Sequence, residues 1–213
     1  MNVLVVIAHP DDEALGCGGT IAKLAEAGAT VDVLLPLRRC DPRGRATWDQ
    51  LLTAFSRSCR ILGARQLIPD SPMDETDAEP RPHILHDLIL PWIERADLVL
   101  THWPGDVNQV HRGVARAVEI ATRPFRRRID VSCFEVPTST DQAFGVGGLP
   151  FVANEHVVHD ATHARLKTEA AATYGSELVM GRRPEDVERS LRARGASIGV
   201  PFAEAFAVAR RFR

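Results

Sequence analysis

The chain contains 213 residues, of which 45% are hydrophobic and 25% are charged. Its 26 basic and 28 acidic side chains leave a formal net charge of -2, and no basic stretch alternates with aromatic residues, which argues against nucleic-acid binding. These proportions are typical of a globular protein, and the length predicts one domain over residues 1–213.

The amino terminus and the cysteines indicate where the protein works. The first apolar run is only a few residues long, with no basic region before it and no small-residue cleavage site after it, so we expect neither a signal peptide nor a membrane span. Cys17, Cys40, Cys59 and Cys133 show no CxxC spacing, and a chain of this size needs no disulfide framework. These features favour a cytoplasmic protein.

The order of apolar runs and helical patterns predicts an α/β fold, with a mainly parallel sheet between layers of helices. The expected strands, in chain order, are 2–8, 30–35, 66–69, 96–101, 131–136 and 151–158. The expected helices lie at about 21–27, 47–62, 84–93, 111–122, 161–174 and 184–194. The first strand is apolar throughout, which suits a strand covered on both faces, and the last is expected at an edge or in a hairpin.

Local signals set several of these boundaries. Thr47 is expected to cap the second helix and Asp160 the fifth, because their side chains can accept hydrogen bonds from the first free amides. Pro184 is expected at the first position of the sixth helix, where its missing N–H costs nothing. Residues 70–82 are rich in proline and acidic side chains, which predicts an exposed loop.

Two polar clusters follow expected strands at their carboxyl ends, where open α/β sheets bind ligands. The first is the sequence HPDDE at residues 9–13, and the second lies at residues 106–111. If the two strands are neighbours, both clusters face one crevice. His9, Asp12 and His111 then supply two imidazoles and a carboxylate, the three-ligand set that leaves a catalytic zinc ion one open position.

Asp11 lies beside this set and is the candidate base. Pro10 stiffens the turn before the two aspartates. Because adjacent carboxylates point in different directions, Asp12 can bind metal while Asp11 faces the water that zinc activates. Zinc lowers the pKa of that water toward about 7, and Asp11 takes its proton and later returns it to a leaving group. The alternative interpretation of His9, Asp11 and Asp12 is a polar turn that caps the next helix and binds no metal.

The glycines after the first cluster raise a second alternative, a dinucleotide site. Gly16, Gly18 and Gly19 follow a strand, but their spacing is not GxGxxG. The acidic HPDDE turn also lies where a pyrophosphate would bind, and its carboxylates would repel phosphate. A dehydrogenase is therefore not expected.

Five stretches of the sequence resemble a known family. They are AHPDDEALGCGGTIAKLAEAG, THWPGDVNQVHRGV, FEVPTST, the expected helix with Lys167 followed by YGSE at residues 174–177, and RARGASIGVPFAEAF. Together they are similar to the LmbE-like (PIG-L) zinc N-deacetylases over most of the chain. The resemblance implies a Rossmann-like domain that removes N-acetyl or related acyl groups from amino sugars and their conjugates, with Zn2+ or another divalent metal as cofactor. It implies the ligands His9, Asp12 and His111, the base Asp11, and a homo-oligomer, since relatives commonly form trimers or hexamers.

The sequence departs from the family pattern at several positions. Many members have Asp before the last ligand histidine, where this chain has Val110; losing a carboxylate that orients a ligand would weaken metal binding about 10 to 100-fold. Asn108 replaces a histidine that some members use to polarise the amide carbonyl, and an amide can donate a hydrogen bond to an oxyanion but no proton. Asp11 would then be both base and acid. The usual arginine and glutamate of the second helix are absent around Leu51 and Ala54, which indicates an unusual substrate.

Two residues are candidates for substrate contacts. Glu135 follows a further strand, in a stretch similar to the family's EVP-like motif, and is expected to contact sugar hydroxyls. Arg38 lies on an arginine-bearing loop, where it can meet a phosphate or carboxylate of the substrate, the alternative being a solvated loop. Three further polar residues are expected to be structural: Glu13, His102 and Asp106.

The sequence therefore predicts a cytoplasmic zinc-dependent N-deacetylase that acts on a small amino-sugar substrate. Two other classes remain open. One is an amidase that acts on a non-sugar amide. The other is a non-catalytic member that binds metal or sugar, because the positions that depart from the family pattern are those expected to hold the substrate.

Overall fold

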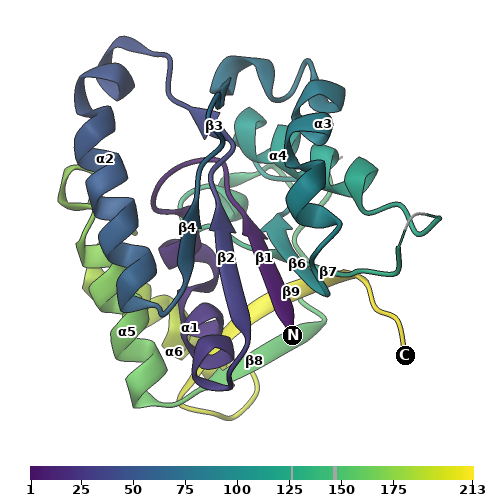
Figure 1. Ribbon diagram of the computed structural model, residues 1–213. Coiled ribbons are helices and arrows are strands. Elements are labelled where there is room, and N and C mark those ends of the chain that lie inside the picture. The colour runs from purple at the N-terminus through teal and green to yellow at the C-terminus, as the bar shows by residue number, and fades with distance from the viewer. Residues whose placement is uncertain (126, 146–147) are drawn as a thin grey trace.

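A seven-stranded sheet forms the centre of the computed structural model, which describes residues 1–125, 127–145 and 148–213 (Figure 1). The strands of this sheet are β1 (Asn2–Val6), β2 (Thr30–Leu34), β4 (Arg65–Leu67), β6 (Leu98–His102), β7 (Asp130–Phe134), β8 (Glu155–His159) and β9 (Phe202–Arg210). Their order is β4-β2-β1-β6-β7-β9-β8. The first five are parallel, and β9 is antiparallel to both of its neighbours. The predicted α/β fold with a mainly parallel sheet is confirmed.

Helices cover both faces of the sheet, with α1, α2, α5 and α6 on one face and α3 and α4 on the other (Figure 1). The helices are α1 (Asp12–Glu26), α2 (Pro42–Ile61), α3 (Pro82–Ile93), α4 (Gln109–Ala121), α5 (Ala161–Ala172) and α6 (Pro184–Ala196). Alternate side chains of β1 enter the two cores: Val3 and Val5 pack on the α1 side, and Leu4 and Val6 on the α3 side. This explains why the first strand is apolar throughout. No helix in the described ranges is both long and apolar enough to cross a membrane.

The position of β1 next to β6 brings the two polar clusters together. The strands are parallel, with Val5 opposite Leu100, so their carboxyl ends reach the same edge of the sheet. The segment after β1 leads into α1, and the segment after β6 leads into α4. A small parallel pair, β3 (Leu37–Arg38) and β5 (Met73–Asp74), lies beyond this edge.

The predicted caps meet two different outcomes. Asp160 caps α5 by accepting a hydrogen bond from the His163 amide, and Pro184 begins α6, as predicted. The prediction for Thr47 is wrong. The cap of helix α2 lies six residues earlier, because the Asp41 side chain accepts a hydrogen bond from the Gly44 amide and proline occupies the first helical position.

Two segments differ from their predicted structure. The strand β9 is absent from the prediction because every second residue of its sequence, FAEAFAVAR, is alanine, which has a low propensity for strands. The loop expected at residues 70–82 contains β5 and a short 3₁₀ helix, Glu75–Asp77, and Ala78 is fully buried. The prediction of an exposed loop is therefore wrong in part.

Helix α1 is interrupted at Cys17, whose backbone angles of φ −139° and ψ 24° are not helical. The glycines around it permit close contacts with other elements. A Cβ atom at Gly16 would lie 2.4 Å from the ring of Phe134 on β7, and one at Gly19 would lie 2.9 Å from the ring of His159 on β8. The glycine-rich stretch therefore serves the packing of α1 against the sheet rather than a phosphate group.

We expect Gly16→Ala to lower the free energy of unfolding by about 1 to 3 kcal/mol, because the added methyl group overlaps the buried Phe134 ring. Urea unfolding followed by circular dichroism measures this loss. Gly175→Ala is the matched control, since a Cβ atom there meets nothing within 4 Å. Equal unfolding free energies for the two variants would contradict the proposed overlap.

Candidate metal centre and active site

Two histidines and one aspartate form a buried cluster at the carboxyl edge of β1 and β6. His9 Nδ1 lies 3.3 Å from His111 Nε2 and 3.5 Å from Asp12 Oδ2, and His111 Nε2 lies 3.4 Å from Asp12 Oδ1. A tetrahedral zinc ion with bonds of about 2.0 to 2.1 Å holds its ligand atoms about 3.3 Å apart. The spacing of this cluster matches that geometry, although Asp12 offers a different oxygen to each histidine.

The chain positions each of these side chains at the start or end of an element. His9 lies three residues beyond β1, Asp12 is the first residue of α1, and His111 is in the first turn of α4. Asp11, between the first two, has a φ of 117°, in the left-handed region that residues other than glycine rarely adopt. Such strain is typical of functional sites, where the surrounding structure holds a side chain in one direction.

The electrostatics of the cluster favour a cation. Burial would lower the pKa of His111, but the charges of Asp12 and Asp106 raise it to about 9. Burial would raise the pKa of Asp12, but His111 and His102 hold it well below its usual range. Asp12 Oδ1 is buried and has no hydrogen-bond partner among the described residues. A divalent cation would satisfy this oxygen, so the donor set fits a metal ion.

Each ligand histidine presents its remote nitrogen to a carboxylate. His9 Nε2 lies 3.3 Å from Glu75 Oε2, and His111 Nδ1 lies 3.2 Å from Asp106 Oδ2. Carboxylates in such positions fix the orientation and tautomer of metal-binding histidines. Glu75 comes from the segment predicted to be an exposed loop, and no spacing in the sequence links it to His9.

Asp106 is itself held by hydroxyl groups. It accepts hydrogen bonds of 2.5 Å from Ser139 and 2.6 Å from Thr140. Burial would raise the pKa of Asp106, but the His111 ring and these two hydroxyl groups lower it to about 2. It therefore stays charged beside His111. Position 110, where many family members have Asp, is a largely buried valine at the edge of the pocket. The carboxylate beside His111 is supplied by Asp106 instead.

We expect Asp106→Asn to weaken zinc binding about 10 to 100-fold, because the neutral amide no longer holds the His111 ring by charge. Competition with a chromophoric chelator measures the zinc dissociation constant. Asp130→Asn, a replacement on β7 away from the cluster, serves as control. Unchanged zinc affinity in the Asp106 variant would show that Asp106 does not orient His111.

Asp11 lies beside the cluster, and its carboxylate is bound by an arginine rather than by the two histidines. Its Oδ2 accepts a hydrogen bond of 3.1 Å from Arg182, which also donates to the hydroxyl of Thr138. Burial and the charge of Asp12 raise the pKa of Asp11 to about 7, against the opposing charge of Arg182. A carboxyl group in this range can both accept and donate a proton near neutral pH.

These side chains open into a pocket of about 400 Å³. The residues that line it beside His9, Asp11, Asp12 and His111 are Arg39, Asp41, Glu75, Thr76, Asn108, Gln109, Val110, Glu177 and Arg182. The sequence predicted Asn108 in this set. It did not predict Glu75, Arg182 or Glu177, because each comes from a segment far away in the chain.

Asn108 lies at the pocket and caps α4 through its amide oxygen, which accepts a hydrogen bond from the Val110 amide. The two predicted substrate contacts lie elsewhere. Glu135 forms a bidentate ion pair with Arg194, and Arg38 pairs with Asp74 at 2.6 Å. Neither lines the pocket.

Two positions of α2, Leu51 and Ala54, lie where the family's arginine and glutamate were expected to contact the substrate. Leu51 is buried in the core on the α1 side, and Ala54 packs against the same core. Neither position faces the pocket. The charged groups that reach the pocket from this part of the chain are Arg39 and Asp41, just before α2.

The polar residues predicted to be structural are buried and bonded. Glu13 accepts hydrogen bonds from Ser58 and Tyr174, and burial raises its pKa to about 7. His102 stacks on the ring of His111 at 4.0 Å, and its Nε2 accepts a hydrogen bond from the Ala8 amide. Burial and the charge of His111 lower the pKa of His102 to about 4, which keeps this ring neutral.

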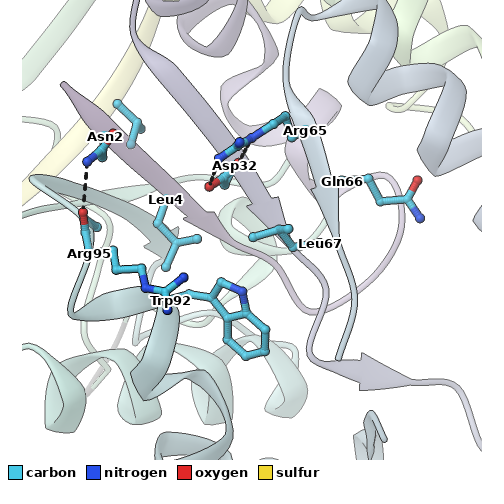
Figure 2. Close-up of a pocket in the computed structure, with 10 residues that line it drawn as sticks. Asn2, Leu4, Asp32, Arg65, Gln66, Leu67, Trp92 and Arg95 are labelled. Atoms are coloured by element: carbon cyan, nitrogen blue, oxygen red, sulfur yellow. Dashed lines mark hydrogen bonds and ion pairs between the residues drawn. The ribbon is translucent and has the colours of Figure 1, made fainter. Parts of the chain in front are cut away.

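A second cavity, of about 370 Å³, lies near the start of β1 and β4, beside the end of α3 (Figure 2). Several of its polar groups pair with one another. Arg65 pairs with Asp32 at 2.6 Å, and the Asn2 side chain donates to the carbonyl of Arg95. This cavity contains no group of metal-binding side chains among the described residues, so the candidate site is the cluster at the opposite edge of the sheet.

Comparisons with solved structures show what the fold resembles. The zinc-inhibited form of teicoplanin deacetylase Orf2 matches over 100% of both chains, with 16% identity and a TM-score of 0.76. N,N'-diacetylchitobiose deacetylase from Pyrococcus horikoshii matches over 97% of this chain and 83% of its own, with 18% identity and a TM-score of 0.72. GalB, the 4-carboxy-2-hydroxymuconate hydratase of Pseudomonas putida KT2440, matches over 100% and 97%, with 19% identity and a TM-score of 0.72. At these identities the likeness concerns the fold.

A comparison with protein families is more specific. No curated protein sequence matches the chain. The model of the PIG-L family, described as GlcNAc-PI de-N-acetylase, matches residues 4–122, which is more than half of the chain and includes His9, Asp11, Asp12 and His111. The protein therefore belongs to the PIG-L family.

Proposed function

We propose that the protein is a zinc-dependent hydrolase that removes an N-acetyl or related acyl group from an amino sugar or its conjugate. The observation that carries this proposal is the buried set of His9, Asp12 and His111 with Asp11 beside it, at the base of one polar pocket. Two histidines and one carboxylate leave a coordination position for substrate or water. Membership of the PIG-L family supports the same reaction class.

The roles of the side chains follow from their positions. His9, Asp12 and His111 would hold the cation, which supplies Lewis acidity toward the amide carbonyl and toward water. Asp11 takes a proton from the attacking water and returns it to the nitrogen as the C–N bond breaks. Arg182 holds the Asp11 carboxylate in place by its 3.1 Å hydrogen bond.

Asn108 is the candidate donor to the carbonyl oxygen as negative charge develops there. Its amide oxygen is used in the cap of α4, so its amide nitrogen is the end of the side chain that carries hydrogens to donate. An oxyanion held by such a donor lowers the barrier to attack. Because an amide donates no proton, Asp11 performs both proton transfers.

The lining of the pocket supports a sugar as the substrate. Apart from Val110, every side chain that lines it is polar or charged, and the pocket has the volume of a small-molecule site. Hydroxyl groups of a sugar can pair with these donors and acceptors, whereas an aromatic or aliphatic amide would leave them desolvated and unpaired. Glu135 and Arg38 contact a substrate only if it extends well beyond the pocket.

The alternatives are distinguished by acetate release across a panel of N-acetyl sugars, sugar nucleotides, glycosides and simple amides, with and without a chelator. We expect release from at least one acetamido sugar, loss of activity on chelation and recovery with Zn2+. Turnover of simple amides alone would identify a non-sugar amidase. Bound zinc, by elemental analysis, without release from any compound would overturn the deacetylase proposal. It would leave a binding protein or an enzyme with another reaction, because a hydratase shares the fold.

A further inference from the structure

A lysine and a glutamate are buried together beside the interruption of α1. Lys167 on α5 and Glu204 on β9 are each 3% exposed, and Lys167 Nζ lies 2.6 Å from Glu204 Oε1. His159 Nε2 lies 3.2 Å from the other carboxylate oxygen. Burial would raise the pKa of Glu204, but the charges of Lys167 and His159 hold it well below its usual range. The pair is therefore ionised inside the protein.

This ion pair contacts four backbone groups of α1. Lys167 Nζ donates to the carbonyl oxygens of Leu15 at 2.8 Å and Gly16 at 3.3 Å. Glu204 accepts from the amides of Gly19 at 2.9 Å and Thr20 at 2.8 Å. In an uninterrupted helix, these four groups would bond to one another, Gly19 to Leu15 and Thr20 to Gly16.

The pair thus provides hydrogen-bond partners on both sides of Cys17, where the backbone angles are not helical. It also explains the glycine at position 18, because a Cβ atom there would lie 3.1 Å from the Lys167 side chain. Residues 12–16 form a single turn, separate in direction from the rest of α1. This turn carries the metal ligand Asp12, and Leu15 bonds back to the Asp11 carbonyl at 2.9 Å.

We propose that Lys167 and Glu204 are positioning residues, which fix the direction of the turn at residues 12–16 and so place Asp11 and Asp12 at the metal centre. Without the Lys167 ammonium, the Leu15 and Gly16 carbonyls would be buried without these partners, and the turn would rotate to find others. Asp12 would then leave the position in which it lies between His9 and His111. The proposal rests on the proposed metal-dependent function, but its test does not need a known substrate.

Lys167→Met removes the ammonium group and keeps most of the side-chain volume. We expect it to weaken zinc binding about 10-fold, as the loss of an outer-shell partner does. The visible spectrum of the Co2+-loaded protein is expected to change with it, because the arrangement of ligand atoms changes. With an acetamido sugar that is turned over, kcat falls and KM stays within twofold. Lys167→Arg, which keeps the charge and the donors, restores part of the zinc affinity.

Lys23→Met is the matched control. Lys23 and Lys167 are the only lysines of the chain, and Lys23 lies on α1 beyond the interruption, where it donates to the Val158 carbonyl. We expect wild-type zinc affinity and a wild-type Co2+ spectrum for this variant. Circular dichroism and urea unfolding show which variants are folded before metal is added.

If Lys167→Met does not fold, Glu204→Asp decides the question, because it keeps the charge but draws the carboxylate away from Gly19 and Thr20. A folded variant at either position that has lower stability but binds zinc and Co2+ as the wild type does would overturn the proposal, since the ion pair would then be structural only. If the wild type releases no acetate from any sugar, the proposed function fails. The zinc and Co2+ comparison still tests the positioning role in that case.

Discussion

Asp11→Asn is expected to retain zinc and to lose about 10²- to 10⁴-fold in kcat, the range that a positioned general base contributes. The amide has nearly the shape of the carboxylate and can still accept a hydrogen bond from Arg182, but it cannot take a proton from water or return one to the leaving amine. His9, Asp12 and His111 are unchanged in this variant. Acetate release and zinc content, measured on the same preparation, test both parts of the expectation.

Asp49→Asn, the same replacement at an exposed position of α2, is the control for Asp11→Asn and is expected to behave as the wild type. Near-normal turnover by the Asp11 variant would remove Asp11 from the role of base. The carboxylates of Asp12 and Glu75 are already used at the ligand histidines. Asp12 is engaged between two histidines, and Glu75 lies at 3.3 Å from the ring of His9.

His111→Ala is expected to lose both zinc and activity. Removal of one of three ligands costs more than the roughly 10 to 100-fold caused by loss of an outer-shell partner, and the remaining His9 and Asp12 do not complete a catalytic zinc set. The variant also leaves the carboxylates of Asp12 and Asp106 buried without the imidazole between them. Zinc affinity by chelator competition and acetate release are the measurements.

The folded state of His111→Ala is checked by circular dichroism and unfolding, because unpaired buried carboxylates are destabilising. His83→Ala, at an exposed position of α3, is its control. Together with Asp11→Asn, the variant separates metal binding from proton transfer. Zinc bound with wild-type affinity by folded His111→Ala would show that the ligand set is wrong.

Local patterns in the sequence were enough to predict the parallel part of the sheet and the central cluster. His9, Asp11 and Asp12 lie next to one another in the chain, and a strand that is apolar on both faces places them at its carboxyl end. The second cluster follows another such strand, so one assumption, that the strands are neighbours, was enough to bring His111 to the same place. The pairing of β1 with β6 provides that neighbourhood, and the ligand atoms lie within 4.8 Å of one another.

The residues that surround this cluster come together only when the chain is folded. Glu75 meets His9 from a segment that looks like an exposed loop, Arg182 meets Asp11 from the other end of the chain, and Lys167 and Glu204 meet across α1 from a helix and a hidden strand. Local patterns of hydrophobicity determine which elements form, because they depend on residues a few positions apart. The residues that orient a metal ligand are far from it in the chain. Burial and charge bring them together, and both depend on how the whole molecule is packed.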